Sequence, residues 1–425
     1  MSSSQALVRV GEPLDMFYQD HANAKKQAIK CEYDTRYTQD FSNKISGTSV
    51  FTIPPNQGIR HIVIVLGYSA STMATVTSGG QNALPRGWGY NALQQLSFRI
   101  GGSSQYFHSG AQLLARNLRM CRTKEQRNSI LSLGGAEISS ATTTAQYAYI
   151  PYSVWATPSD DALGIPLSSD LLSQQVQITA TLNPASAFWL QNTNTGVTPV
   201  ALPTQFDTAY FQVEQIQMVD RAMGLANRIN MNEHMYSMAL PSFDQQEVVF
   251  TNVSTANPAV PVPFVLTGFR AGEVKKIQVW LAPKAVASTS SGAVGLLNWV
   301  LPASAEILYA GLKYATYLNG SSAIWNLLDG TAPSAVDQSQ LVPATASSTY
   351  TWTSTPVLSQ WVELPFAQPT GSDYEADVLT HGKEITNGIV NLNIGLPDTA
   401  TYDVHIVYVY NCVVGFSKGS AELIF

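Results

Sequence analysis

The sequence predicts an all-β protein made of two consecutive sandwiches, and three observations lead to this expectation. The chain has 425 residues, which exceeds the size at which one core keeps growing, so two domains of roughly 200 residues each are expected. Short apolar or alternating segments recur in both halves and are separated by clusters of Pro, Gly, Ser and Asn, as in sandwiches. One convincing helical pattern interrupts them, and folds with a helix after every strand are excluded.

In the first half, strands are expected wherever apolar residues alternate or form a short run. Leu93 to Ile100 places Leu96, Phe98 and Ile100 on one face, as a sheet with one solvated face requires. The other strands expected in this half cover residues 50–53, 62–66, 147–150, 175–182 and 210–219.

The helical pattern lies between these strands. From Ser109 to Leu133, apolar side chains surround a polar middle rich in Arg and Gln. Ser109 is a candidate N-cap, and Gly134-Gly135 is a stop signal. The pattern predicts one helix, or two shorter ones, inserted into the first sandwich.

The segments outside the sandwiches have a different character. Residues 1–43 are expected to form an N-terminal arm that contains a short helix over residues 13–30 and is ordered only by partners. The weakly periodic segment 221–238 is interpreted as the connection between domains. The resulting division is an arm (1–43), a first sandwich (44–225), a linker (226–239) and a second sandwich (240–425).

The second half repeats the pattern of short strands. Segments 288–292 and 334–351 are low in charge and rich in Ser, Thr and Ala, which predicts long surface loops. The expected strands cover residues 246–250, 263–266, 274–281, 315–318, 360–364, 389–394 and 402–414.

The composition limits the classes of partner. Charged residues make up 12% of the chain, about half of the ~25% typical of soluble proteins. A mostly uncharged surface suits faces that are buried against other copies, although secreted β-proteins share this bias. The net charge of −6 argues against a subunit that coats nucleic acid, because phosphate binding needs clustered Lys and Arg. No direct, sequence-specific nucleic-acid binding is expected.

The cysteines and the apolar segments indicate the compartment. Cys31, Cys121 and Cys412 are widely spaced, which fits neither a disulfide scaffold nor a zinc site. Reduced, structural thiols are therefore expected. The N-terminus lacks the pattern of a signal peptide, and no apolar run reaches the ~18 residues of a transmembrane helix. The chain is expected to be made and folded in the cytosol.

One acidic segment has the spacing of a metal-binding loop. Asp373, Glu375, Asp377 and Glu384 occupy positions 1, 3, 5 and 12 of an EF-hand-like loop, whose oxygens could surround calcium. Val378 stands where the turn needs Gly, and neither flank has a helical pattern. A solvated acidic loop is therefore favoured over a calcium site.

Two further motifs fail at residues that their chemistry requires. Residues 87–92 fit G-x-G-x-x-A, but a strand is expected after them, and no acidic residue lies at the ribose-binding offset. Residues 67–71 follow a strand like a nucleophile elbow, but Ser71 replaces the last Gly and a Thr-rich loop is expected in place of a helix. The six histidines form no close pair. No catalytic, cofactor or metal residues are assigned, and the protein is not expected to be an enzyme.

Several segments, in order, resemble one family over nearly the whole chain. Residues 86–104 are similar to a strand that ends in an Ile-Gly-Gly turn and leads to a helix after Ser-Gly, here Ser109-Gly110. Residues 147–182, 314–325 and 391–415 resemble later strands and turns of the same family. That family is the double jelly-roll major capsid proteins of icosahedral double-stranded DNA viruses.

The resemblance implies a fold and a function. The fold would be two eight-stranded jelly rolls, and the function that of a structural capsid protein. Its homotrimers would form pseudo-hexameric capsomers. The implied partners are neighbouring capsomers, penton and minor capsid proteins, with an internal membrane left open. The protein would be synthesised in the host cytoplasm and located in the virion. The alternative is a secreted β-sandwich that binds or cleaves glycans.

Overall fold

A computed structural model describes most of the chain. The described residues are 29–34, 45, 47–52, 59–100, 106–119, 121, 123–152, 176–191, 200–218, 236–239, 245–269, 273–283, 298–319, 334–343, 352–366, 382–385, 389–410, 413–417 and 420–424.

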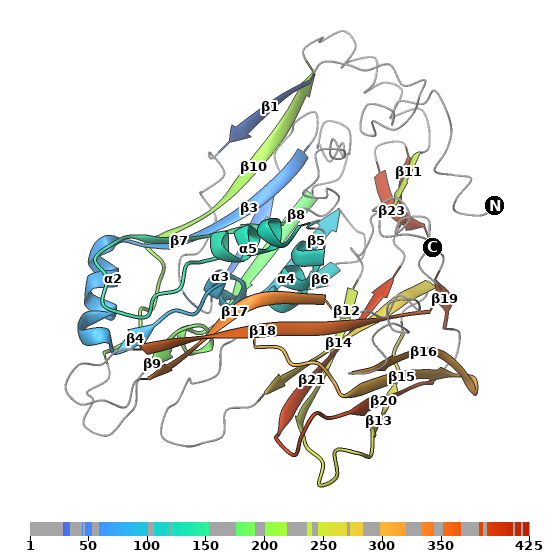
Figure 1. Cartoon of the computed structure of the whole chain (residues 1–425). Helices are drawn as coiled ribbons and strands as arrows, with labels where there is room; N and C mark the ends of the chain where they lie inside the picture. The colour runs from blue at the N-terminus through green and yellow to red at the C-terminus, as the bar shows by residue number, and fades with distance from the viewer. Residues whose placement is uncertain are drawn as a thin grey trace.

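The first sandwich consists of two four-stranded antiparallel sheets, in the orders β1-β10-β3-β7 and β2-β8-β5-β6 (Figure 1). Phe51 stacks on Phe211 across the two sheets, with ring centroids 4.8 Å apart. The strands are β1 (Ile29–Asp34), β2 (Thr48–Thr52), β3 (Ile59–Tyr68), β5 (Leu93–Ile100), β6 (Tyr106–His108), β7 (Gln146–Pro151), β8 (Val176–Leu182) and β10 (Thr208–Met218).

Short elements connect these strands. A small separate sheet pairs β4 with β9, and helices follow β3 and β6. Their bounds are α2 (Ala70–Val76), η2 (Ser78–Gly80), β4 (Asn82–Ala83), α3 (Trp88–Ala92), α4 (Gly110–Arg119), α5 (Lys124–Leu133), η3 (Ala185–Ala187) and β9 (Leu190–Gln191). Among the described residues, no helix is long and apolar enough to cross a membrane.

The second sandwich has one sheet in the order β12-β21-β14-β18-β17, with β19 also on β14, and a second sheet in the order β13-β20-β15-β16. A three-stranded sheet, β11-β22-β23, completes this half. The strands are β11 (Tyr236–Ala239), β12 (Gln245–Val253), β13 (Val262–Leu266), β14 (Glu273–Pro283), β15 (Ser304–Tyr309), β16 (Leu312–Leu318), β17 (Ser334–Pro343), β18 (Trp352–Pro365), β19 (Lys383–Glu384), β20 (Val390–Gly395), β21 (Tyr402–Tyr410), β22 (Val413–Ser417) and β23 (Ser420–Ile424).

The two sandwiches share one strand order. In each, the first strand pairs with the last, the last with the third, and the third with the sixth (β1-β10-β3-β7 and β12-β21-β14-β18). The other sheets also match, because β2-β8-β5-β6 and β13-β20-β15-β16 both run second, seventh, fourth, fifth. These eight strands in two facing sheets make each half a jelly roll. The predicted fold class is confirmed.

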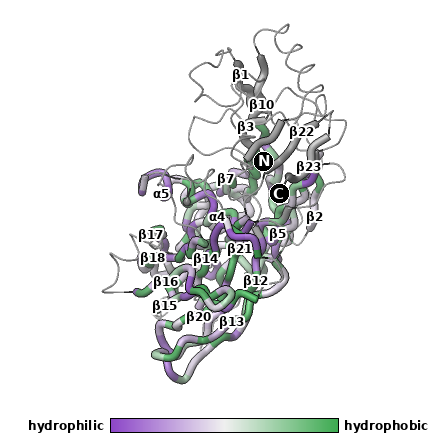
Figure 2. The backbone as a smooth tube through the Cα atoms, turned by 90° about the vertical axis from the view of Figure 1, so that its right-hand side faces the viewer, coloured by the Kyte–Doolittle hydropathy of each residue, from purple (hydrophilic) through white to green (hydrophobic). Residues whose placement is uncertain are grey.

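Alternation along the strands separates core from surface. In β3, Ile62, Ile64 and Leu66 are fully buried between the sheets of the first sandwich, and each such side chain contributes about 1.5–3 kcal/mol. Figure 2 shows apolar and polar residues mixed along the strands of the second sandwich, whose core lies between its own two sheets. In β5, Leu96 and Phe98 are buried as expected, and the side chain of Ile100 lies outside the described residues.

The predicted helical insertion is confirmed as two helices, α4 and α5. Ser109 Oγ accepts a hydrogen bond from the Gln112 amide at 3.2 Å, and the Ser109 amide donates to Gln112 Oε1 at 2.7 Å. This reciprocal pair is a capping box. Thr123 and Gln126 form a second one at the start of α5, which ends at Gly134.

Several expectations were wrong. The predicted loop 334–351 contains β17, which forms because it pairs with β18 along its whole length. The predicted strand 402–414 covers β21 and the start of β22, which belong to two different sheets. Within the predicted arm, β1 pairs with β10, so this segment belongs to the first sandwich; β1 also includes the last two residues of the predicted helix 13–30, which otherwise lies outside the described residues. The segment 221–238 is described only at its end, where β11 begins.

Candidate assembly surfaces

The second sandwich packs one of its outer faces against the first. Along β21, Val404, Ile406 and Tyr408 belong to the core of the second sandwich. The alternating residues Val407 and Val409 instead belong to the cluster of buried residues that includes the first-sandwich core. An antiparallel sheet commonly leaves one face solvated. Here both faces are dry at these positions, because the first sandwich covers the outer one.

Three tryptophans form the centre of this buried outer face. Trp280 of β14 stacks on Trp299, with centroids 4.9 Å apart. Trp361 of β18 meets Trp299 edge to face at 5.7 Å. All three belong to the cluster shared with the first sandwich. Aromatic pairs in these geometries contribute about 0.5–1.5 kcal/mol beyond their buried area.

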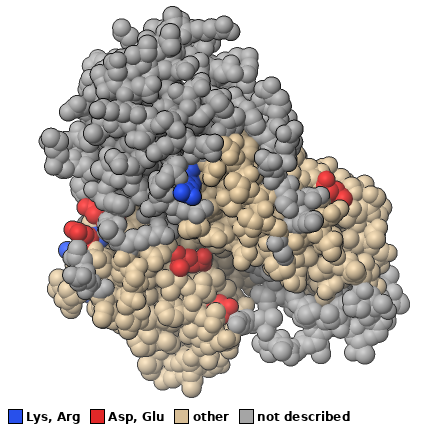
Figure 3. All heavy atoms as spheres, turned by 180° about the vertical axis from the view of Figure 1, so that it is seen from behind, with Lys and Arg blue, Asp and Glu red and all other residues tan. Residues whose placement is uncertain are grey.

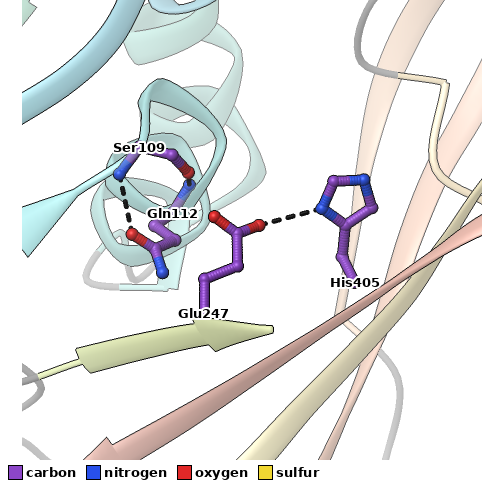
Figure 4. A network of polar contacts seen from close by, with 4 residues as sticks. All are labelled: Ser109, Gln112, Glu247 and His405. Atoms are coloured by element: carbon purple, nitrogen blue, oxygen red, sulfur yellow. Dashed lines mark hydrogen bonds and ion pairs between the residues drawn. The ribbon is translucent and has the colours of Figure 1, made fainter. Parts of the chain in front are cut away.

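Polar contacts continue the same face toward α4. His405 stacks on Trp280 with centroids 5.4 Å apart, and its Nδ1 lies 2.8 Å from Glu247 Oε1. Figure 4 shows the Glu247 carboxylate between His405 and the Ser109–Gln112 cap of α4. A carboxylate is favourable near a helix N-terminus, because the first amides and the helix dipole present positive charge there. β12 of the second sandwich also lies against β6 of the first.

A buried ion pair lies on the same strands. Lys276 Nζ is 2.9 Å from Glu363 Oε2, with the lysine side chain 5% and the glutamate side chain 15% exposed. Gln278 Nε2 donates to the other oxygen of Glu363 at 2.9 Å. The carboxylate therefore has a cationic partner and a neutral donor. Such pairing is required when charges are removed from water.

The hairpin of β17 and β18, termed here the strap, forms a second connection between the two sandwiches. Figure 1 shows it running beneath the helices of the first sandwich toward β4 and β9. At its far end, Trp352 donates its indole N–H to the Gly80 carbonyl at 2.9 Å. Leu341 and Trp352 form a small buried cluster with Ala83 of β4 and Leu190 of β9.

Polar contacts run between the strap and the first sandwich. Lys124 Nζ lies 2.9 Å from Asp337 Oδ2, and Ser339 Oγ is hydrogen-bonded to a Glu137 carboxylate oxygen. The Trp352 amide donates to the Ser139 carbonyl at 3.3 Å. The strap is therefore attached along its length as well as at its end.

The described surface carries little charge. Seen from behind, most of its described part shows neither acidic nor basic side chains (Figure 3). Large apolar side chains also reach solvent on both sandwiches. The most exposed are Val50, Leu133, Tyr147, Val249, Val260, Val265, Leu312, Leu318, Leu358 and Ile389.

The segment with the G-x-G-x-x-A pattern has a packing role. Residues 88–92 form α3, which Gly87 precedes with φ 74°, and the expected strand, β5, follows directly from Leu93. A Cβ at Gly89 would lie 2.5 Å from Ala148 Cβ and 2.7 Å from the Gly134 carbonyl oxygen. The second glycine thus permits close contact between α3 and β7.

Ser69 acts as a helix cap. A helix, α2, follows it where a Thr-rich loop was expected, because Ser69 Oγ accepts from the Thr72 amide at 3.3 Å. The Asp207 carboxylate also accepts from the Ser69 amide at 2.6 Å. Desolvation raises the pKa of Asp207, but its hydrogen bonds to Ser69 and Thr72 together outweigh this and lower the pKa. Ser71 stands where an elbow requires Gly.

The remaining candidates are only partly described. Asp373, Glu375 and Asp377 lie outside the described residues, and Glu384 of β19 pairs with Glu273 of β14. Within the described part of the chain, no group of three or more His, Cys, Asp or Glu could hold a metal. Cys121 is a buried free thiol, and burial raises its pKa to about 11. The side chains of Cys31 and Cys412 lie outside the described residues.

The fold was compared with known proteins. No family model matches the sequence, and no curated protein matches it. Among solved structures, a quasi-atomic model of the PBCV-1 virus capsid has a TM-score of 0.65 at 13% identity, covering 96% of this chain and 99% of that one. The Sputnik virophage structure has a TM-score of 0.53 at 11% identity, covering 99% and 93%. The Faustovirus major capsid protein has a TM-score of 0.50 at 9% identity, covering 97% and 93%. The chain therefore has the double jelly-roll fold of these viral capsid proteins.

Proposed function

We propose that this protein is a major capsid protein whose copies build an icosahedral viral shell. The observation that carries the proposal is the similarity in fold to viral capsid proteins over 96% of the chain. Two further features support it. The two jelly rolls are joined by a buried aromatic face and by the strap, so the chain is suited to act as one rigid block. The described surface is poor in charge, as expected of faces buried against other subunits.

The proposed building unit is a homotrimer. Three copies of a chain with two similar sandwiches present six sandwiches, which can occupy a six-fold lattice position as a pseudo-hexameric capsomer. Cyclic symmetry of this kind is common among oligomers. The proposed partners are neighbouring capsomers, penton proteins and minor capsid proteins, and the role is structural. Synthesis in the host cytoplasm would precede incorporation into the virion.

The proposed domain division follows the strand pairing. Strands up to Met218 pair only among themselves in the described part of the chain, and strands from Tyr236 onward do the same. This supports a first jelly roll that ends near residue 225 and a second that begins near residue 240. Because β1 pairs with β10, we include residues 29–34 in the proposed first jelly roll.

Light scattering coupled to size-exclusion chromatography tests the proposal. At micromolar concentration, we expect a particle of three times the chain mass of 46.0 kDa. It should persist from about 0.15 M to about 1 M salt, because interfaces that are mostly apolar are little screened. Negative-stain images should show trimeric rings or shells. A stable monomer at all concentrations would overturn the proposal and favour the glycan-binding alternative.

A further inference from the structure

We propose that bound water molecules lie in the contact between the two sandwiches and complete the hydrogen bonds of polar side chains buried there. This contact is termed here the seam, and it comprises the outer face of β14, β18 and β17 where the first sandwich covers it. The inference does not depend on the proposed function, because the seam lies within one chain whether or not copies assemble.

The seam buries polar atoms that have no hydrogen-bond partner among the described residues. No acceptor in the described part of the chain pairs with the indole Nε1 of Trp280 or of Trp361, although both side chains are fully buried. The described residues also offer no acceptor to Nε2 of Gln338 and no donor to Oε1 of Gln278, whose residues are 7% and 1% exposed. Because buried polar groups are almost always paired, with protein or with ordered water, these atoms point to bound water.

Strand register places the unpaired atoms of β14 and β18 on one face. Gln278 and Trp280 are two residues apart in β14, so their side chains project from the same side of the sheet. Gln278 is paired with Glu363 of β18, and Trp361 lies two residues before Glu363. All four side chains therefore belong to the face that meets the first sandwich, where both tryptophans are buried.

The same face continues across the strap and meets a polar group of the first sandwich. Gln338 is paired with Val357 of β18, which lies four residues before Trp361 and so projects from the same side. From the first sandwich, Arg127 of α5 donates from Nη1 to the Ala335 carbonyl at 3.5 Å. Its buried Nε has no partner among the described residues. Unpaired groups therefore come from both sides of the seam.

The orientation of the Gln278 amide is fixed by its neighbour. The Glu363 carboxylate is ion-paired with Lys276 and can only accept hydrogen bonds. Gln278 must therefore present its Nε2 to Glu363 Oε1, at 2.9 Å, which leaves its own carbonyl oxygen directed away from Glu363. The set of unpaired atoms thus contains an acceptor as well as several donors.

Water is the ligand that suits this mixed set. A cation could serve only Gln278 Oε1, and an anion could serve only the N–H donors and would share a face with the Glu363 carboxylate. A water molecule both donates and accepts, and a buried one typically makes about three hydrogen bonds to otherwise unpaired polar groups. The core between the two sheets of the second sandwich differs, because among its described residues the Tyr408 hydroxyl alone is unpaired.

Exchanging one unpaired side chain for an apolar one tests the inference by the sign of the effect. Gln338→Met keeps the length of the side chain and removes its amide. If the seam holds water, the variant loses hydrogen bonds, and the folding equilibrium constant measured by urea denaturation should fall by about fivefold or more. If the seam is dry, the variant removes an unpaired buried group, and an unchanged or raised constant overturns the inference. The control Gln94→Met changes an exposed glutamine and should leave the constant close to the wild-type value.

The indole groups give a second measurement that does not depend on stability. In the ultraviolet resonance Raman spectrum, one tryptophan band shifts when the indole N–H donates a hydrogen bond. The difference spectrum between the wild type and Trp361→Phe isolates the band of Trp361. The matched reference is Trp189→Phe, because Trp189 is buried and donates its N–H to the Tyr68 hydroxyl at 3.2 Å. The Trp361 band should lie at the hydrogen-bonded position of Trp189, and a band at the unbonded position overturns the inference.

A crystal structure at a resolution that shows ordered water identifies the partner directly. Water peaks should lie within hydrogen-bond distance, about 2.7–3.2 Å, of Trp361 Nε1 and Gln278 Oε1. Protein atoms or an ion in place of these waters, or a seam without them, would overturn the inference. All three measurements apply to a monomer as well as to a trimer, so a protein that fails to assemble would overturn the proposed function alone.

Discussion

The two sandwiches have the same strand order, but their equivalent outer faces have different surroundings. In the second sandwich, Trp280 and Trp361 are buried against the first. In the first sandwich, Tyr147 and Tyr149 of the matching sheet remain exposed. The connection between the fifth and sixth strands also differs, because it contains α4 and α5 in the first sandwich and β17 in the second. Strand order therefore determines each jelly roll, whereas the connections determine which faces come into contact.

The largest expected effect is a loss of stability that differs between the two equivalent faces. Replacing Trp361 by Ala should lower the free energy of unfolding by about 3 to 5 kcal/mol, because it leaves a cavity beside Trp299. Its indole N–H has no hydrogen-bond partner among the described residues, so the loss within the chain is one of packing. The matched change Tyr149→Ala should cost about 1 kcal/mol or less in the unassembled chain. Urea denaturation measures both, and equal losses would contradict the difference between the faces.

The stability contributions of a buried and an exposed ion pair are expected to differ in the same way as those of the buried and exposed faces. Replacing Lys276 by Met should cost about 3 kcal/mol, because Glu363 would lose its cationic partner in a site shielded from water. Replacing Lys124 by Met should change stability by about 0.5 kcal/mol or less, since the Lys124 side chain is 71% exposed and that of Asp337 is 46% exposed. Thermal denaturation at low and high salt measures both. A larger loss in the Lys124 variant would mean that the strap depends on its charge contact.

The attachment of the strap should show a smaller, local effect. Leu341 is fully buried in the small cluster with Trp352, so Leu341→Ala should cost about 2 kcal/mol. Hydrogen exchange should accelerate in β17 and in the first part of β18, because local opening needs less free energy once the anchor is weakened. The control Val342→Ala changes a neighbour that is 37% exposed, and exchange there should remain close to the wild type. Equal exchange in both variants would argue against anchoring at Leu341.

The strands that were predicted correctly have strong local patterns. Strand β3 contains a run of five apolar residues, and β5 alternates so regularly that its expected and observed bounds agree. Strand β17 has few apolar residues and forms through backbone pairing with β18, so its own sequence predicts a loop. Strand β1 was missed for a similar reason, because it forms by pairing with β10 and its own sequence does not predict that pairing.

The candidate surface depends on contacts between residues that are distant in sequence. The apolar run in β14 indicates a strand buried on both faces, but nothing near Trp280 in the sequence shows that the first sandwich covers it. The equivalence of β7 and β18 appears only once the strand order is known, because the two segments share no obvious motif. Tyr147 and Tyr149 could have been recognised as outward residues from their alternation with Ala148 and Ile150.

The smallest effect concerns the helical insertion that distinguishes the first sandwich. Thr123 Oγ1 accepts from the Gln126 amide at 3.2 Å, and the Thr123 amide donates to Gln126 Oε1 at 3.3 Å. Thr123→Ala removes the hydroxyl acceptor and should lower stability by about 1 kcal/mol. Thr123→Ser keeps the hydroxyl and should remain close to the wild type. Because α5 lies against the strap, faster hydrogen exchange in the Ala variant should reach β17 as well as the first turn of α5. An effect confined to α5 would show that the strap is held independently of this helix, by Trp352 and its neighbours.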